Sequence, residues 1–88
     1  MFVYFSDSRC NDHLLGAADS LREAMRIGLD YVASTGFKSY YVRSWPVPEE
    51  NMIVLDFGSH SEFLLVRMEP ENGDATSIFN DYLKEKNE

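Results

Sequence analysis

The chain has 88 residues, which is room for one domain. Its formal net charge of −7 at pH 7 disfavours binding to phosphate backbones and anionic lipid. Its longest apolar runs, at residues 52–55 and 63–66, are far shorter than the ~20 residues of a membrane-spanning helix, and its first residues lack the basic and apolar regions of a secretory signal. Cys10 is the only cysteine, which excludes an internal disulfide and favours a cytoplasmic location.

The first predicted element is a strand over residues 1–5, which are rich in aromatic and β-branched side chains. A polar, turn-like segment follows at residues 6–12. Residues 13–17 allow two interpretations, because they can pair back on the first strand as a hairpin or lead directly into a helix. We favour the hairpin.

A helix is predicted to begin at Ser20. Ser20 and Glu23 form a capping box, in which the serine hydroxyl accepts from the Glu23 amide and the Glu23 carboxylate reaches back. Gly28 costs about 1 kcal/mol against alanine inside a helix, so we expect it to let the helix approach the sheet closely. Gly36 is placed to end the helix with a positive φ angle.

Three strands and a second helix are predicted in the rest of the chain. The first strand covers residues 37–45 and ends at the two prolines that follow, because proline cannot donate to a sheet ladder. Residues 52–57 and 63–68 are strands separated by a turn short enough for a hairpin. The last helix is capped by Asp74 or Thr76 and has an apolar stripe.

Together these elements predict a single α+β domain over all 88 residues, with two layers, an antiparallel meander sheet and the order β(β)αβββα. Both helices pack most simply on one face of the sheet, which leaves the other face open to solvent. On that outer face we expect aromatic and polar side chains together: Tyr41, Arg43, Trp45, Asp56 and Met68.

The net charge lies entirely in the second half of the chain. Up to Trp45 there are five acidic and five basic residues, whereas from Pro46 on there are ten acidic and three basic residues. In size, charge and element order the chain resembles small acidic α+β inhibitors carried by phages, of the anti-CRISPR and anti-restriction kind. That resemblance implies an acidic surface that mimics nucleic acid and blocks a basic cleft in an enzyme, but it carries over no functional residues. A solvated acidic surface is the plainer interpretation.

Three groups of residues resemble parts of catalytic or metal sites but lack what those sites need. Cys10 and His13 share a loop, and His60 is the other soft ligand, whereas a zinc site needs four ligands and thiol catalysis needs an oxyanion hole. Residues 56–58 spell the metal-binding tripeptide of protein kinases without the glycine loop or lysine strand. Residues 59–62 contain triad residue types, but adjacent side chains in a turn diverge. We therefore expect that the protein is not an enzyme and that it binds neither a metal ion nor a cofactor.

The aromatic side chains could stack the bases of single-stranded nucleic acid, but that binding mode also requires a positively charged groove. Because the second half of the chain is strongly negative, we expect no direct binding to nucleic acid.

The sequence thus predicts a small, non-enzymatic protein–protein interaction module whose partner is a protein with a basic surface. The contact surface is either the acidic second half or the aromatic sheet face, since aromatic residues beside an arginine are typical interface anchors. The candidate partner-binding residues are Glu49, Glu50, Glu62, Glu69, Glu71, Asp74, Asp81, Tyr41, Arg43 and Trp45. The alternatives are a structural or homo-oligomerising domain, such as a homodimer, and a small enzyme or ligand-binding protein that uses Cys10, His13 and His60.

Overall fold

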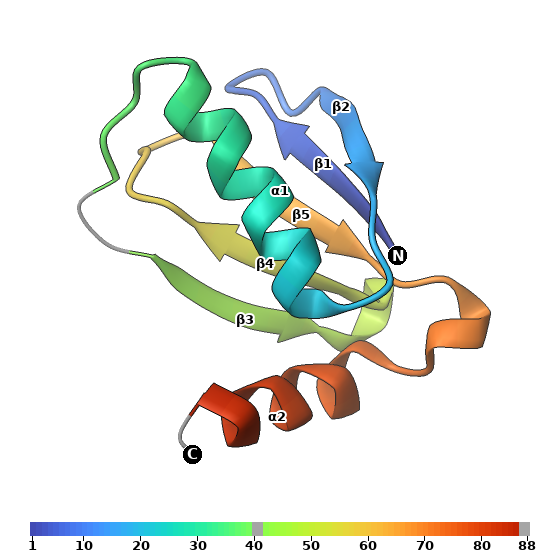
Figure 1. Cartoon of the computed structure of the whole chain (residues 1–88). Coiled ribbons are helices and arrows are strands. Elements are labelled where there is room, and N and C mark those ends of the chain that lie inside the picture. Colours follow the sequence, from blue (N-terminus) through green and yellow to red (C-terminus); the bar gives the residue numbers. More distant parts are fainter. Residues whose placement is uncertain (40–41, 87–88) are drawn as a thin grey trace.

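Five antiparallel strands form one sheet, and two helices cover one of its faces (Figure 1). The computed structural model describes residues 1–39 and 42–86. The strands are β1 (Phe2–Ser6), β2 (Asp12–Ala17), β3 (Arg43–Val47), β4 (Met52–Asp56) and β5 (Phe63–Arg67), and the helices are α1 (Leu21–Ser34) and α2 (Ala75–Lys86). Short 3₁₀ helices lie at Pro48–Glu50 and Pro70–Asn72. The predicted α+β class and element order are confirmed.

The strand order is β2-β1-β5-β4-β3, so β1 lies between its hairpin partner β2 and the last strand β5. The favoured hairpin interpretation of residues 13–17 is therefore confirmed. The hairpin register shifts next to Tyr4, which leaves Leu15 as an extra residue in β2. Because β2 and β3 are the two edges, α1 connects opposite sides of the sheet (Figure 1).

Helix α1 begins and ends as the sequence predicts. The Glu23 amide donates to the Ser20 hydroxyl at 3.2 Å, and the Glu23 carboxylate accepts from the Asp19 amide at 3.4 Å. A Cβ atom added to Gly28 would lie 2.9 Å from Cδ1 of Leu64, so the glycine does allow a close approach to β5. Gly36 has a φ angle of +87°.

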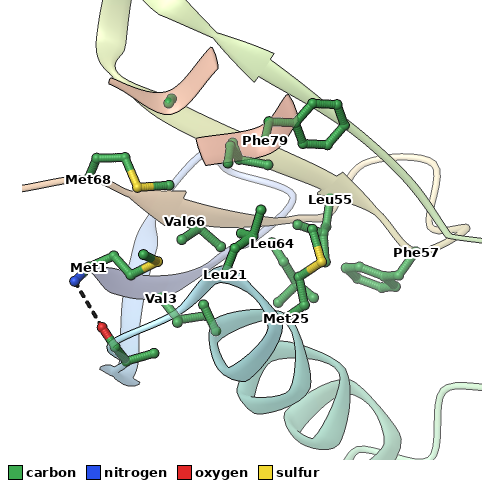
Figure 2. Packing of buried hydrophobic residues seen from close by; sticks show 14 of the residues in the cluster. Met1, Val3, Leu21, Met25, Leu55, Phe57, Leu64, Val66, Met68 and Phe79 are labelled. Atoms are coloured by element: carbon green, nitrogen blue, oxygen red, sulfur yellow. Dashed lines mark hydrogen bonds between the residues drawn. The ribbon is translucent and has the colours of Figure 1, made fainter. Parts of the chain in front are cut away.

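The core lies between the sheet and the two helices (Figure 2). Alternate residues of the strands enter it, among them Val3, Leu55 and Leu64, which are fully buried. Helix α1 packs against β1, β2 and β5, and α2 packs against β3 and β4, where Phe79 reaches the core (Figure 2). Within the described residues, neither helix is long and apolar enough to cross a bilayer.

Two predictions about the later strands are wrong. The strand expected over residues 37–45 begins at Arg43 and continues through Pro46 to Val47. A proline is accepted there because β3 is an edge strand, where one side of the backbone needs no sheet donor.

Met68 was expected on the outer face but is buried in the core (Figure 2). It follows the same alternation as Leu64 and Val66, and its amide donates to the Asn51 carbonyl at 3.0 Å. This hydrogen bond keeps the inward alternation one residue beyond the end of β5.

Candidate protein-binding surfaces

Two adjoining hollows lie where the start of β1, the start of α1 and the segment leading into α2 meet. They have volumes of about 310 and 300 Å³, and both are lined by Met1, Asp19 and Asn72. Such volumes are at the small end of the range for ligand pockets.

Acidic groups outnumber basic groups in the described lining of both hollows. The basic groups there are the Arg22 guanidinium, 3.8 Å from Glu85, and the Met1 ammonium, 3.2 Å from Glu69. We call the six carboxylates of the lining the acidic end: Asp19, Glu23, Glu69, Glu71, Asp81 and Glu85.

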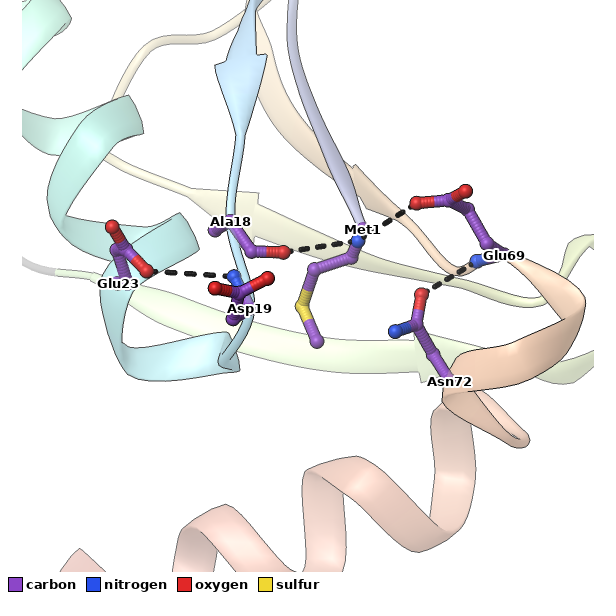
Figure 3. Close-up of polar contacts among 6 residues, drawn as sticks. All are labelled: Met1, Ala18, Asp19, Glu23, Glu69 and Asn72. Carbon is purple, nitrogen blue, oxygen red and sulfur yellow. Dashed lines mark hydrogen bonds and ion pairs between the residues drawn. The ribbon is translucent and has the colours of Figure 1, made fainter.

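Hydrogen bonds between distant segments hold this region together (Figure 3). The Met1 nitrogen donates to the Ala18 carbonyl at 3.0 Å and to Oε1 of Glu69 at 3.2 Å. The Glu69 amide donates to Oδ1 of Asn72 at 2.9 Å, which closes the 3₁₀ turn at Pro70–Asn72. These bonds bring Glu69 and Glu71 beside the start of α1, although some fifty residues separate the two segments.

Three of the acidic residues predicted from the sequence, Glu69, Glu71 and Asp81, line the hollows. Asp74 instead caps α2, since its carboxylate accepts from the Ser77 amide at 3.2 Å and from the Ser77 hydroxyl at 2.7 Å. These hydrogen bonds lower the pKa of Asp74.

The remaining predicted acids are not part of the acidic end. Glu49 and Glu50 lie in the first 3₁₀ helix, where a carboxylate oxygen of Glu50 is 3.9 Å from the Arg67 guanidinium. Glu62 precedes β5 and lines a separate hollow with Phe5 and Phe37. Glu62 therefore lies at the opposite end of the sheet, whereas Glu49 and Glu50 lie at the same end as the acidic end without lining its hollows, because Met52 pairs with Arg67 and Arg67 pairs with Phe2.

Sequence reasoning missed Asp19 and Glu23, because both lie in the half of the chain whose charges cancel. The signal that could have found them was the pairing of residues 13–17 with the first strand. That hairpin places the start of α1 next to Met1, and so next to the residues that follow β5.

The second candidate surface is the sheet face that neither of the two described helices covers, which we call the open face. Its central row runs across all five strands in register and consists of Leu14, Tyr4, Leu65, Val54 and Trp45. Leu65 and Val54 are only 8% exposed, whereas Leu14 and Trp45, at the two ends of the row, are 60% and 39% exposed. Tyr41, which was also predicted for this face, lies outside the described residues.

An ion pair between Arg43 and Asp56 flanks the central row. The Asp56 carboxylate accepts from the guanidinium at 2.8 Å and from the Gly58 amide at 3.0 Å. These bonds, above all that from Arg43, lower the pKa of Asp56. Asp56 points to the open face, as expected, but it is not exposed there, because it is buried beneath the arginine.

Arg67 lies across the middle of the open face. Its guanidinium carbon is 5.9 Å from the centre of the Tyr4 ring, and its nitrogens lie 3.4 Å from Asp12 and 3.9 Å from Glu50. The described part of the open face thus combines an apolar row with charges of both signs.

The residues of the alternative, enzymatic interpretation do not form one group. His13 Nε2 lies 2.8 Å from Oδ2 of Asp7, and this contact, with two backbone amides, lowers the pKa of Asp7 to about 2. Cys10 is exposed with a φ angle of +65°, and His60 is exposed in the loop between β4 and β5. In the described part of the chain, no three histidine, cysteine or acidic side chains are grouped so that they could hold a metal ion.

Comparison with protein-family models, with curated proteins and with solved structures gives no significant match. The function of the chain therefore has to be inferred from its own surfaces.

Proposed function

We propose that this chain is a non-enzymatic module that binds a basic surface of another protein through its acidic end. One observation supports the proposal: six carboxylates from three separate segments surround two adjoining hollows, against two cationic groups in the described lining, the Arg22 guanidinium and the Met1 ammonium. Like charges gathered from distant segments destabilise a fold slightly, so their concentration favours a role in binding.

The chemistry of such a surface suits lysine and arginine side chains. A long basic side chain can enter a hollow of this size and meet carboxylates on several sides, whereas an anionic ligand is repelled. The negative potential also accelerates encounter with a basic partner, and this effect falls steeply as salt is added.

A specific form of this function is inhibition of a nucleic-acid-binding enzyme, in which the acidic end occupies the cleft that normally holds phosphates. The net charge of −7 and the resemblance to small acidic phage inhibitors support this form. In that case the partner should lose affinity for nucleic acid when the chain is added.

Affinity capture from the native host, followed by mass spectrometry, supplies a partner for the test. We expect its affinity to fall steeply between low and high salt, and a flat salt dependence would contradict the proposal. The informative variant is Glu71→Gln with Asp81→Asn, which should weaken binding and reduce the salt dependence.

The matched control is Asp30→Asn with Glu62→Gln, which changes the net charge equally but lies outside the acidic end. If the control weakens binding as much as the acidic-end variant, the net charge alone is responsible and the assigned surface is wrong.

A further inference from the structure

We propose that the open face binds the open face of a second copy of this chain, about a two-fold axis parallel to β5. This surface is distinct from the acidic end, so the inference goes beyond the proposed function.

The first argument is that the central row is exposed at its two ends, although Leu65 and Val54 in its middle are only 8% exposed. Both helices lie on the opposite face, yet Leu14 and Trp45 remain exposed at the two ends of the row. Five strands spaced ~4.8 Å apart give a face about 24 Å wide and about 17 Å long. Such a face is smaller than a standard interface of ~800 Å² per partner, so we expect a reversible dimer that forms at high protein concentration.

The edges of the sheet are poorly suited to pairing two copies strand to strand. Pro46 removes a donor from β3, and the extra residue Leu15 distorts β2. A second copy is therefore more readily bound face to face.

The second argument concerns the charge of the open face, which favours a second copy of the chain as its binding partner. The described open face has two arginines against three carboxylates, Asp12, Glu50 and Asp56, so it is nearly neutral on a chain whose net charge is −7. Two such acidic molecules repel each other least when these faces meet. A basic partner, in contrast, is attracted to the acidic end.

The third argument is that the face complements itself under the proposed axis. The rotation places β5 over β5, β1 over β4 and β2 over β3 of the second copy. Trp45 then meets Leu14 of the second copy at both ends of the row, so that the exposed ring packs on an exposed aliphatic side chain.

The same rotation also brings opposite charges together. Arg43 precedes Trp45 by two residues and Asp12 precedes Leu14 by two residues, on strands that run in the same direction. The two residues are thus level at opposite edges of the face, and each meets the other across the axis.

Sedimentation equilibrium over a series from low micromolar to millimolar protein tests the proposal. The wild-type mass should rise from 10.1 kDa toward twice that value. Because repulsion between the acidic copies is screened, added salt should strengthen the dimer, whereas it weakens binding of a basic partner. A monomer throughout the series would overturn the proposal and leave the proposed function unaffected.

Two single variants locate the contact. Leu14→Glu and Trp45→Lys should each weaken dimerisation by at least about tenfold, since each alters both copies of a two-fold contact. Leu83→Glu is the matched control, because Leu83 is 38% exposed but lies on α2, away from the open face. Far-ultraviolet circular dichroism should show that all three variants are folded.

Mixing the two variants tests the axis. A dimer of one Leu14→Glu chain and one Trp45→Lys chain has a new glutamate–lysine contact at one site and the native tryptophan–leucine contact at the other. We expect the mixture to associate more tightly than either variant alone. If the wild type dimerises but the mixture stays monomeric, or if the Leu83 control also abolishes the dimer, the assigned contact is wrong.

Discussion

The two faces of the sheet bury apolar side chains in different ways. On the covered face, Leu64 lies under α1, next to Gly28, and the core cluster around it consists of apolar residues. On the open face, Leu65 is almost as buried, yet neither described helix covers it, and its neighbours across the sheet are Tyr4 and Val54. The open face also includes a buried carboxylate, that of Asp56, which is stabilised by Arg43.

A low exposed fraction therefore does not by itself identify the core of a thin domain. Leu64 and Leu65 are adjacent in the sequence and point to opposite faces, because side chains alternate along a strand. Burial on the covered face serves stability, whereas burial on the open face leaves a surface that another molecule can still cover.

The largest expected effect comes from truncating these two leucines. We expect Leu64→Ala to lower the free energy of unfolding by about 3–4 kcal/mol, because the helices prevent the cavity from closing. Leu65→Ala should cost about 1–2 kcal/mol, since solvent and flexible neighbours can fill the space. Urea denaturation of both variants measures the difference, and equal losses would mean that the open face is as tightly packed as the core.

The buried ion pair of the open face should give the next largest effect. Asp56→Asn removes the charge that Arg43 and the Gly58 amide stabilise, and we expect a loss of about 2 kcal/mol. Asp12→Asn is the control on the same face, because the Asp12 ion pair is exposed and should be worth less than about 0.5 kcal/mol. Similar losses in the two variants would argue against any special role for burial.

A smaller effect is expected where α1 meets the covered face. Gly28→Ala gains about 1 kcal/mol of helix propensity but forces a methyl group against Leu64, at an overpacking cost of about 1–3 kcal/mol. We expect a net loss of about 1 kcal/mol in thermal or urea unfolding. A gain in stability would show that the Leu64 side chain can move aside.

The smallest expected effect is the loss of stability at acidic pH, which should come from the open face, because the core cluster of the covered face has no titratable side chain. The pKa of Asp56 is lower in the folded state, so its stabilising contribution is complete above the unfolded value of about 4 and is lost as the pH falls through the folded value. Asp56→Asn should therefore flatten the decline in stability at acidic pH. The decline should not vanish, because Asp7, with a pKa of about 2, contributes in the same direction.

Much of the fold could be predicted from local patterns. The capping box at Ser20 predicted the start of α1 correctly, and the strand predicted over residues 52–57 is β4, because each pattern depends on neighbours within a few residues. The start of β3 and the burial of Met68 could not be predicted in this way. They depend on which strand is an edge and on a hydrogen bond to Asn51, and both are properties of the assembled sheet.

The candidate surfaces depended still more on the tertiary structure. Counting the charged residues in each half of the chain placed the net negative charge after Pro46. The pairing of β1 with both β2 and β5 is what brings Asp19 and Glu23 beside Glu69 and Glu71. Trp45 was expected on an outer face, yet its place in a row of five apolar side chains follows from the register of four strand pairs.

The α+β class, the order of the elements, the limits of α1 and the acidic character of the chain could be derived from composition and short-range periodicity. The joining of acidic residues from both halves of the chain beside Met1, and the apolar row on a nearly neutral open face, came only from the three-dimensional structure. Such surfaces are assembled from segments whose proximity is set by long-range strand pairing, which no local pattern encodes.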